Sequence, residues 1–275
     1  MVVLIQMIEI GLLNILEVMN IITYTLINER RKMKKNFVKT KNVKNLISLL
    51  DEIEKLLANI PKLALVYGEH GLGKTHSIIW WATRNDAIYV RANNEITQNG
   101  LLKVLVEELG ERPFFYMQEN YNLILKHLRQ YPKIIVVDEV DYLIGSKNTI
   151  EILRDIQDNT GVPIVLIGMG MLDKKIARYK HFEDRIYKKL KFEHFNQNDI
   201  SEILSQITDL KFSTDAILYL STRVNQFRQL AKIIEKLEKI SKTNQFNKLD
   251  EQLLKGIMYE RQSINSLPKI EKIYA

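Results

Sequence analysis

The sequence predicts an α/β fold with a parallel sheet, followed by a smaller helical region. Two short apolar runs, Lys62–Tyr67 and Lys133–Val137, have the composition of strands that are buried on both faces, as strands of parallel sheets are. The first run leads into a glycine-rich segment and then into an apolar helix expected over Thr75–Thr83. With only 11 glycines and 5 prolines in 275 residues, an all-β architecture is disfavoured.

Charge and cysteine content limit the classes of function. The chain has 40 lysines and arginines against 33 acidic residues, a net charge of +7, which is compatible with an anionic partner but does not distinguish DNA, RNA and membrane surfaces. It has no cysteine, which excludes disulfides, cysteine-ligated zinc, iron–sulfur clusters and thiol catalysis. The five histidines lack the spacing of metal ligands.

Residues 1–32 differ from the rest of the chain. They are apolar, but Glu9 and Glu17 interrupt the run, so no uncharged stretch reaches the ~18 residues of a membrane-spanning helix. A basic amino-terminal region and a small-residue cleavage site, which a secretory signal needs, are both lacking. Residues 29–32 can be encoded by a purine-rich sequence of the kind that serves as a ribosome-binding site, placed just before a start codon at Met33. We expect a cytoplasmic protein without a membrane segment, in which residues 1–32 either precede the true start or extend outside the core.

Residues 33–60 are expected to form a basic lead-in and one helix. Eight basic residues and no acid lie between Arg30 and Lys44. This run is either a solvated, flexible segment or an arm that contacts nucleic-acid phosphates. Leucine and isoleucine residues at helical spacing then predict an amphipathic helix over Val43–Leu57, directly before the first strand.

The segment between the first strand and its helix has the pattern of a phosphate-binding loop. It reads GEHGLGKT and fits G-x-x-x-x-G-K-[ST], in which glycines let backbone N–H groups surround phosphates and the next helix adds its positive amino-terminal end. We expect Lys74 to reach the β- and γ-phosphates of ATP and Thr75 to ligate Mg²⁺. The predicted nucleotide-binding residues are Gly68, Glu69, His70, Gly71, Leu72, Gly73, Lys74, Thr75 and His76, together with Asp138 of the next motif.

A second motif follows the apolar run Lys133–Val137. Asp138 and Glu139 are the pair of acids that a P-loop ATPase carries at the carboxyl end of a strand. Asp138 is predicted to hold Mg²⁺ through water, and Glu139 to orient and polarise the attacking water. Asp141 either shares in catalysis or, as such residues more often do, caps or stabilises the loop.

These two motifs and a third stretch resemble a known family. The third stretch, Leu153–Met169, reads LRDIQDNTGVPIVLIGM. Over Lys62–Lys232 the chain looks like the AAA+ ATPases of DNA transposition, and most like the phage Mu B-type target-selection ATPases. The resemblance implies a P-loop NTPase (AAA+) base of three αβα layers over residues 61–195, with Ile164–Ile167 as a strand beside the one that bears Asp138. A small all-helical lid over residues 196–262 and a tail over 263–275 would follow.

The resemblance also implies roles for two arginines. Arg185 stands where related AAA+ proteins place an arginine finger, which acts in trans on the neighbouring subunit's site. The alternatives are a surface ion pair of Arg185 with Glu183 or Asp184, or Arg178 as the finger. Arg228 matches the sensor-2 position of the lid, where it would contact the γ-phosphate in cis; an ordinary exposed helix arginine is the alternative. The predicted catalytic residues are then Glu139, Lys74, Arg185 and Arg228.

Helix caps support the lid. Asn196, then Ser213 or Thr214, and then Asp250 precede apolar stretches at helical spacing, so each is expected to cap a helix of a small four-helix bundle.

Two departures from the family bear on function. The turn Gly168–Met171 lacks the polar side chain with which most AAA+ proteins position water, so slow hydrolysis is expected. Residues 33–61 are too few for the amino-terminal DNA-binding domain of the Mu B-type proteins, so DNA contacts are expected on the ATPase unit. The resemblance suggests Asn93–Leu102 for such contacts, and charge suggests the basic residues Lys147, Lys174, Lys175, Arg178, Lys180, Lys188, Lys189 and Lys191.

The sequence thus predicts an ATP- and Mg²⁺-dependent ATPase that assembles as a ring or helix on double-stranded DNA. It would regulate DNA transposition by engaging a transposase or another DNA-processing protein. A helicase loader of replication is the alternative, because Gly73–His76 also resembles the loader-like ATPases of insertion sequences. A nucleotide-gated protein scaffold that does not bind DNA is the third reading.

Overall fold

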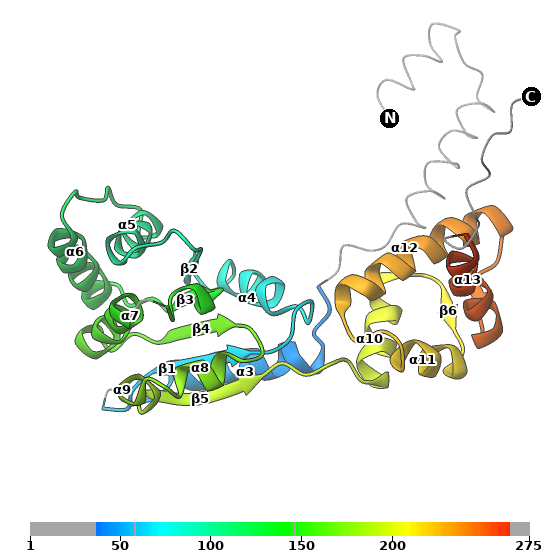
Figure 1. The fold of residues 1–275 in the computed structure, drawn as a ribbon, viewed down its shortest axis with the longest axis horizontal. Coiled ribbons are helices and arrows are strands. Elements are labelled where there is room, and N and C mark those ends of the chain that lie inside the picture. The colour runs from blue at the N-terminus through cyan, green and yellow to red at the C-terminus, as the bar shows by residue number, and fades with distance from the viewer. Residues whose placement is uncertain (1–36, 58, 146, 265–275) are drawn as a thin grey trace, which may run out of the picture. The chain divides into compact units, whose positions relative to one another are not determined.

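The computed structural model describes residues 37–57, 59–145 and 147–264, which divide into two units (Figure 1). We call them the α/β unit, residues 39–195 with 225–227, and the helical unit, residues 196–224 and 228 onward with 37–38. The expectations for residues 1–32 and for the tail beyond residue 264 lie outside the described residues. Among the helices that are described, none is long and apolar enough to cross a membrane.

The α/β unit is built on five parallel strands in the order β2-β3-β4-β1-β5. In chain order they are β1 (Leu63–Tyr67), β2 (Ile88–Arg91), β3 (Ile135–Asp138), β4 (Ile164–Gly168) and β5 (Ile186–Lys191). The strand expected at Ile164–Ile167 is confirmed, and it lies between β1 and β3. Because the strands are parallel, the carboxyl ends of β1 and β3 meet at one edge of the sheet, where open α/β sheets bind their ligands.

Helices cover both faces of this sheet, which gives the predicted three layers (Figure 1). One face is packed by α3 (Lys41–Glu54) and α4 (Lys74–Ala82). The other face is packed by α5 (Gln98–Glu108), α6 (Met117–Gln130), α7 (Lys147–Thr160), α8 (Leu172–Ile176) and α9 (Lys180–Glu183). Alternate residues of β1 enter the two cores, Leu63 and Leu65 one and Ala64 and Val66 the other, because strand side chains alternate in direction.

The edge strand β5 carries lysines on both faces. Its pairing with β1 shifts by one residue at Tyr187. Beyond this bulge Lys188 pairs with Glu52 of α3, whereas Lys189 pairs with Glu183 of α9. Lys188 and Lys189 thus lie on opposite faces of the sheet, and both belong to ion pairs within the unit.

Two lysines near the start of α3, which belong to the basic run, also contact the α/β unit. Lys39 Nζ lies 5.4 Å from the centre of the Trp80 ring, and Lys41 Nζ lies 3.1 Å from Glu193 Oε2. These two residues are held against the α/β unit, and contact of the run with nucleic-acid phosphates stays a prediction. The bases from Arg30 to Lys35 lie outside the described residues.

The helical unit contains α10 (Gln197–Ile207), α11 (Thr214–Ser221), α12 (Phe227–Asn244) and α13 (Glu251–Ile264). The expected caps are confirmed, because the side chains of Asn196, Ser213 and Asp250 accept N–H bonds from the first turns of α10, α11 and α13. The unit is not purely helical, since β6 (Lys211–Phe212) and β7 (Lys248–Leu249) form a short parallel pair. Two residues are too few for the alternation that predicts a strand.

Candidate nucleotide-binding site

The predicted phosphate loop connects β1 to α4 and packs against its own unit. Gly68 has φ +158° and lies so close to residue 192 that a Cβ there would be 2.7 Å from the Phe192 carbonyl oxygen, so no side chain fits. Gly71 has φ +75°, accepts a bond at its carbonyl from Phe227 N–H at 3.0 Å, and lies under the Gln226 side chain. Leu72 is buried, whereas Glu69, His70 and His76 are exposed. The loop is therefore held by close contacts at its first residue, Gly68, and at its middle, Gly71.

The Lys74 side chain bonds to the backbone of the phosphate loop. Its Nζ donates to the carbonyl oxygens of Gly68 at 2.6 Å and Glu69 at 2.8 Å. Burial lowers the pKa of Lys74, although the carboxylates of Asp138, Asp141 and Glu69 act in the opposite direction. The half-buried Lys74 ammonium donates to neutral carbonyl oxygens in this state. Phosphate oxygens would accept stronger, charge-assisted bonds from it.

Asp138 is held in one orientation at the carboxyl end of β3. Its side chain is buried, with Oδ2 accepting from the Tyr89 hydroxyl at 3.0 Å and Oδ1 accepting from the Glu139 N–H at 2.8 Å. Burial and the Asp138 charge raise the pKa of Tyr89, so this tyrosine remains a donor at physiological pH.

Thr75 and Asp138 have the chemistry that Mg²⁺ requires. Both offer oxygen, which this ion prefers, and each carboxylate oxygen of Asp138 accepts one protein hydrogen bond and keeps a lone pair for a metal-bound water. These residues would hold the ion, which when bound supplies positive charge to the phosphates. No group of three or more His, Asp or Glu side chains in the described residues forms a metal site of its own.

Glu139 is paired with an arginine that the sequence did not single out. Glu139 adopts a left-handed backbone (φ 55°), which costs a non-glycine residue about 1–2 kcal/mol. Its Oε1 accepts from Arg91 Nη2 at 2.6 Å, and this bond raises the pKa of Arg91. Arg91 ends β2, in register with Asp138 on β3. The predicted base is therefore placed at the correct sheet edge with its carboxylate engaged.

Asp141 stabilises the turn after β4, as the more common role of such a residue predicts. Its Oδ2 accepts from Met169 N–H at 2.6 Å, and its Oδ1 accepts from Lys175 Nζ at 2.8 Å. Both oxygens are thus used to hold the segment that lacks a polar side chain. The structure gives Asp141 a positioning role.

The two predicted arginines lie in different units. Arg185 Nη1 lies 2.9 Å from Asp158 Oδ1 of α7, so the expected ion pair exists but with neither Glu183 nor Asp184. Glu183 instead pairs with Lys189. Arg228 belongs to the helical unit, and its role stays a prediction.

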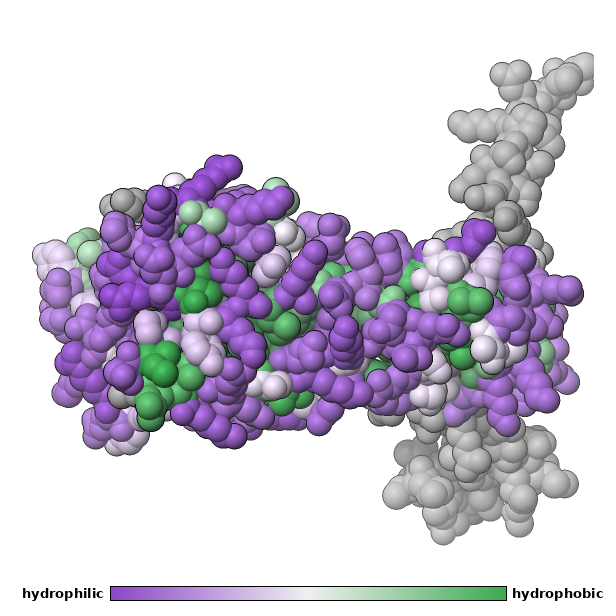
Figure 2. All heavy atoms as spheres, turned by 90° about the horizontal axis from the view of Figure 1, so that it is seen from below, coloured by the Kyte–Doolittle hydropathy of each residue, from purple (hydrophilic) through white to green (hydrophobic). Residues whose placement is uncertain are grey.

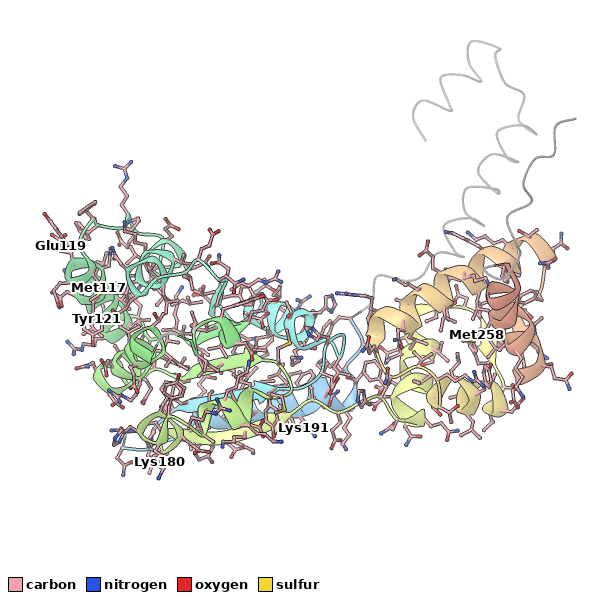
Figure 3. All side chains as sticks on the ribbon, in the orientation of Figure 1. Met117, Glu119, Tyr121, Lys180, Lys191 and Met258 are labelled. Carbon is pink, nitrogen blue, oxygen red and sulfur yellow. The ribbon has the colours of Figure 1, made fainter. Side chains whose placement is uncertain are left out.

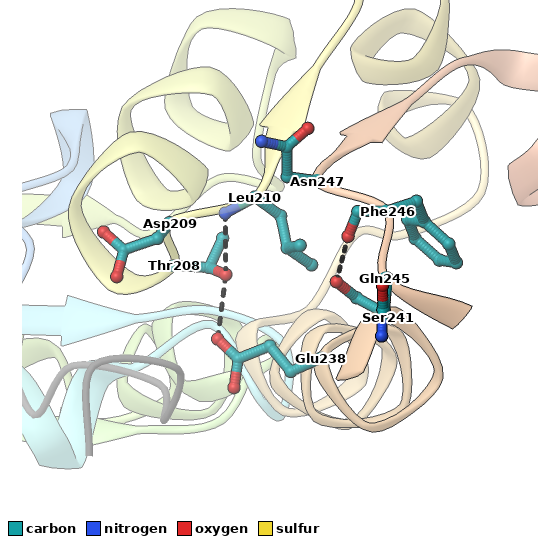
Figure 4. Close-up of a pocket in the computed structure, with 8 residues that line it drawn as sticks. All are labelled: Thr208, Asp209, Leu210, Glu238, Ser241, Gln245, Phe246 and Asn247. Atoms are coloured by element: carbon teal, nitrogen blue, oxygen red, sulfur yellow. Dashed lines mark hydrogen bonds between the residues drawn. The ribbon is translucent and has the colours of Figure 1, made fainter. Parts of the chain in front are cut away.

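A pocket of about 180 Å³ in the helical unit is a poor alternative for a nucleotide (Figure 4). Its lining includes Asp209 and Glu238 and no lysine or arginine. Thr208 donates to Glu238 Oε1 at 2.8 Å and accepts from Leu210 N–H at 3.3 Å (Figure 4). These polar groups of the pocket lining therefore bond to each other. Phosphates would meet like charge there.

Tyr89, Arg91 and Gln226 complete the site and were not predicted for it. The signal for the first two was weak: they belong to a four-residue strand whose carboxyl end must reach the same edge as Asp138. Gln226 stands next to the expected sensor-2 arginine, but only its packing on Gly71 shows a role at the loop.

The sheet order, the loop after β1 and the acids after β3 define an AAA+ P-loop NTPase fold. A family model described as "AAA domain" matches residues 59–176. A "Potential ATP-binding protein" of Staphylococcus aureus is 23% identical over 201 residues, which are 62% of this chain and 72% of that protein.

Solved structures of the same fold include two ORC structures. The ORC2 protein of Aeropyrum pernix, in ADPNP–ADP complexes, superposes with a TM-score of 0.61 at 14% identity, covering 87% of this chain and 75% of that one. Drosophila ORC bound to DNA gives 0.58 at 15% identity, with 89% and 68% covered. At these identities the likeness establishes the fold.

Replacing Arg91 by alanine is expected to raise the basal rate of ATP hydrolysis. The variant frees the Glu139 carboxylate, and because the pair is solvent-exposed the increase should be small, about two- to fivefold. Steady-state phosphate release measures it, with Arg91→Lys, which keeps the charge, as the control. A slower Arg91→Ala enzyme would indicate instead that Arg91 assists the reaction.

Proposed function

We propose that the protein is an ATPase that binds ATP at the loop of residues 68–75, assembles with copies of itself and acts on double-stranded DNA. The observation that carries this proposal is the convergence of Lys74, Asp138 and Glu139 at one sheet edge. In this arrangement Lys74 would hold the phosphates, and Asp138 and Thr75 would hold Mg²⁺. The Glu139 carboxylate would separate from Arg91 and accept a proton from the attacking water.

Two processes compete for this activity. The resemblance of Leu153–Met169 to transposition ATPases favours target selection with a transposase. That stretch forms much of α7 and all of β4, where Arg154 pairs with Glu151 and Asp155, so it supports the framework of the site. The ORC structures share the fold alone with this chain, so replication initiation or helicase loading fits no worse.

The surface beside β5 offers exposed cations for DNA. Of the basic residues suggested there, Lys175, Lys188 and Lys189 are in ion pairs, whereas Lys174, Lys180 and Lys191 are exposed and have no ion-pair partner among the described residues. Figure 3 shows Lys180 and Lys191 along the same side of the α/β unit. These three lysines are the proposed phosphate contacts.

DNA binding measured against salt concentration tests this proposal. We expect a duplex to bind the full chain more tightly with a non-hydrolysable ATP analogue than without it, and log affinity to fall linearly with log salt. Replacing Lys174, Lys180 and Lys191 by glutamine should reduce the slope by about 1 for each phosphate that is no longer neutralised. Lys188→Gln/Lys189→Gln, which removes ion-paired lysines, is the matched control. DNA binding that does not depend on salt or on nucleotide would contradict the proposal, and absence of DNA binding would support the scaffold reading.

Arg185→Ala is expected to lower ATP hydrolysis at least about tenfold while ATP still binds, because the missing cation belongs to the neighbouring site. Its bond to Asp158 is partly exposed and therefore easily exchanged. Asp158→Ala, which frees Arg185, should stay active.

Mixing variants distinguishes action in trans from a local defect. Arg185→Ala and Glu139→Gln subunits should together recover part of the activity, because some interfaces then combine an intact Glu139 with an intact Arg185. Arg178→Ala is the control for the rival finger. If mixed oligomers show no recovery with either arginine variant, the trans finger is wrong.

A further inference from the structure

The loop between α5 and α6 exposes four consecutive large apolar residues. Phe114, Phe115, Tyr116 and Met117 are 46%, 79%, 67% and 39% exposed, and we call them the aromatic loop. The other exposed large apolar residues in the described part of the chain stand singly, as is normal at protein surfaces. The visible face of the molecule in Figure 2 is likewise mostly hydrophilic, with apolar residues gathered in small areas. A continuous group of this kind indicates an interaction surface.

Buried hydrogen bonds hold the aromatic loop in one conformation. Asn120 is fully buried, and its side chain accepts from Phe114 N–H at 2.7 Å and donates to the carbonyl oxygens of Phe114 at 3.0 Å and Tyr116 at 3.3 Å. Asn99 donates to the Phe115 carbonyl oxygen at 3.2 Å. The Phe115 and Tyr116 rings then pack edge to face at 5.2 Å. A preorganised loop loses little conformational entropy when it binds.

Charge around the aromatic loop is unfavourable for nucleic acid. Between residues 103 and 119 there are four acids, Glu107, Glu108, Glu111 and Glu119, all exposed, against the two bases Lys103 and Arg112. Figure 3 places Met117 and Glu119 at the end of the α/β unit away from Lys191, which ends β5 near the phosphate loop. The aromatic loop is thus separate from Lys191 and the phosphate loop, and Figure 3 shows Lys180 on the lower side of the unit, away from Met117. Of the segment Asn93–Leu102, Asn99 lies beside the loop.

We propose that the aromatic loop docks a partner protein through an apolar segment bordered by lysine or arginine residues. Phe115 and Tyr116 would supply the buried aromatic anchors that dominate such interfaces, and the four carboxylates would pair with the partner's cations at the rim. The buried Asn120 amide bonds to the backbone of the aromatic loop and so keeps the Phe115 and Tyr116 rings exposed in the unbound protein. Without these bonds the two rings would fold onto α5 and α6. This surface is a second site, independent of ATP and DNA.

Selection of peptides tests the proposal directly. Random display peptides are selected on the full wild-type chain and counter-selected on Phe115→Ser/Tyr116→Ser, whose changes lie on exposed side chains and leave the core unaltered. The surviving peptides should combine aromatic or leucine residues with a net positive charge. As synthetic peptides they should bind wild type at least about tenfold more tightly than the double variant, and less tightly as salt rises.

Matched variants separate the parts of the argument. Tyr131→Ser, which removes another exposed tyrosine, should bind the peptides as wild type does. Asn120→Ala keeps the aromatic rings but frees the loop, so it should weaken binding. Glu107→Gln/Glu108→Gln/Glu111→Gln, which leaves only Glu119, should reduce the salt dependence. The proposal would be overturned if the selected peptides were acidic, or if no selected peptide depended on the aromatic loop for binding. Loss of duplex DNA affinity in Phe115→Ser/Tyr116→Ser would assign the loop to DNA, and a change in its sedimentation without peptide would assign it to a second copy of the chain.

Discussion

Replacing Glu139 by glutamine is expected to slow ATP hydrolysis by about two orders of magnitude or more while ATP binding persists. The amide has nearly the volume of the carboxylate but cannot accept the proton of the attacking water. The Asp138 orientation should survive, because it depends on the backbone N–H of residue 139 and on the Tyr89 hydroxyl. Bound ATP should therefore accumulate, together with any oligomer that ATP stabilises.

Two measurements are needed to interpret the Glu139→Gln result. Equilibrium binding of a fluorescent ATP analogue should match wild type, and phosphate release should give the loss of rate. Asp141→Asn is a useful comparison, because Asp141 holds the turn after β4 through Met169 and Lys175. That variant should lower thermal stability more than Glu139→Gln does. A Glu139→Gln enzyme with nearly wild-type turnover would remove Glu139 as the base.

The parts of the fold that local sequence determines were predictable. The β1 and β3 runs are apolar because both faces are covered, and the GEHGLGKT segment needs glycine where the backbone approaches Phe192 and Gln226. The caps at Asn196, Ser213 and Asp250 are likewise local, since each side chain bonds to an N–H three residues on. Pattern and chemistry agree at these positions over a few residues, which is the range that sequence reasoning covers.

The interactions that were missed depend on which distant segments become neighbours. Arg91 and Glu139 are 48 positions apart and meet only because β2 and β3 pair in one register. Arg185 finds Asp158, 27 positions away, while nearby Glu183 is used by Lys189. The aromatic loop gave no periodic signal, because what distinguishes it is the buried bonding of Asn120 beneath it.

Replacing Lys74 by alanine is expected to abolish most of the stabilisation that ATP gives to the fold. Loss of a charge-assisted contact to the phosphates should weaken ATP binding by about 2–4 kcal/mol, or about 30- to 1,000-fold. At an ATP concentration of about 100 times the wild-type Kd, the wild type gains about 2.7 kcal/mol of stability, whereas a variant that binds 100-fold more weakly gains about 0.4 kcal/mol. The wild-type Tm should then rise by about 5–10 °C and that of the variant by about 1–2 °C.

The pH dependence of ATP binding should identify Lys74 as the source of this effect. Burial lowers the pKa of Lys74 in the free protein, and bound phosphates would raise it, so binding takes up a proton once the pH exceeds the free-protein pKa. Wild-type affinity should therefore fall as the pH rises through that pKa, and Lys74→Arg, which stays protonated, should not show this fall. Lys180→Ala, which removes an exposed lysine, should behave as wild type. A wild-type thermal shift in Lys74→Ala would mean that the phosphates bind somewhere other than this loop.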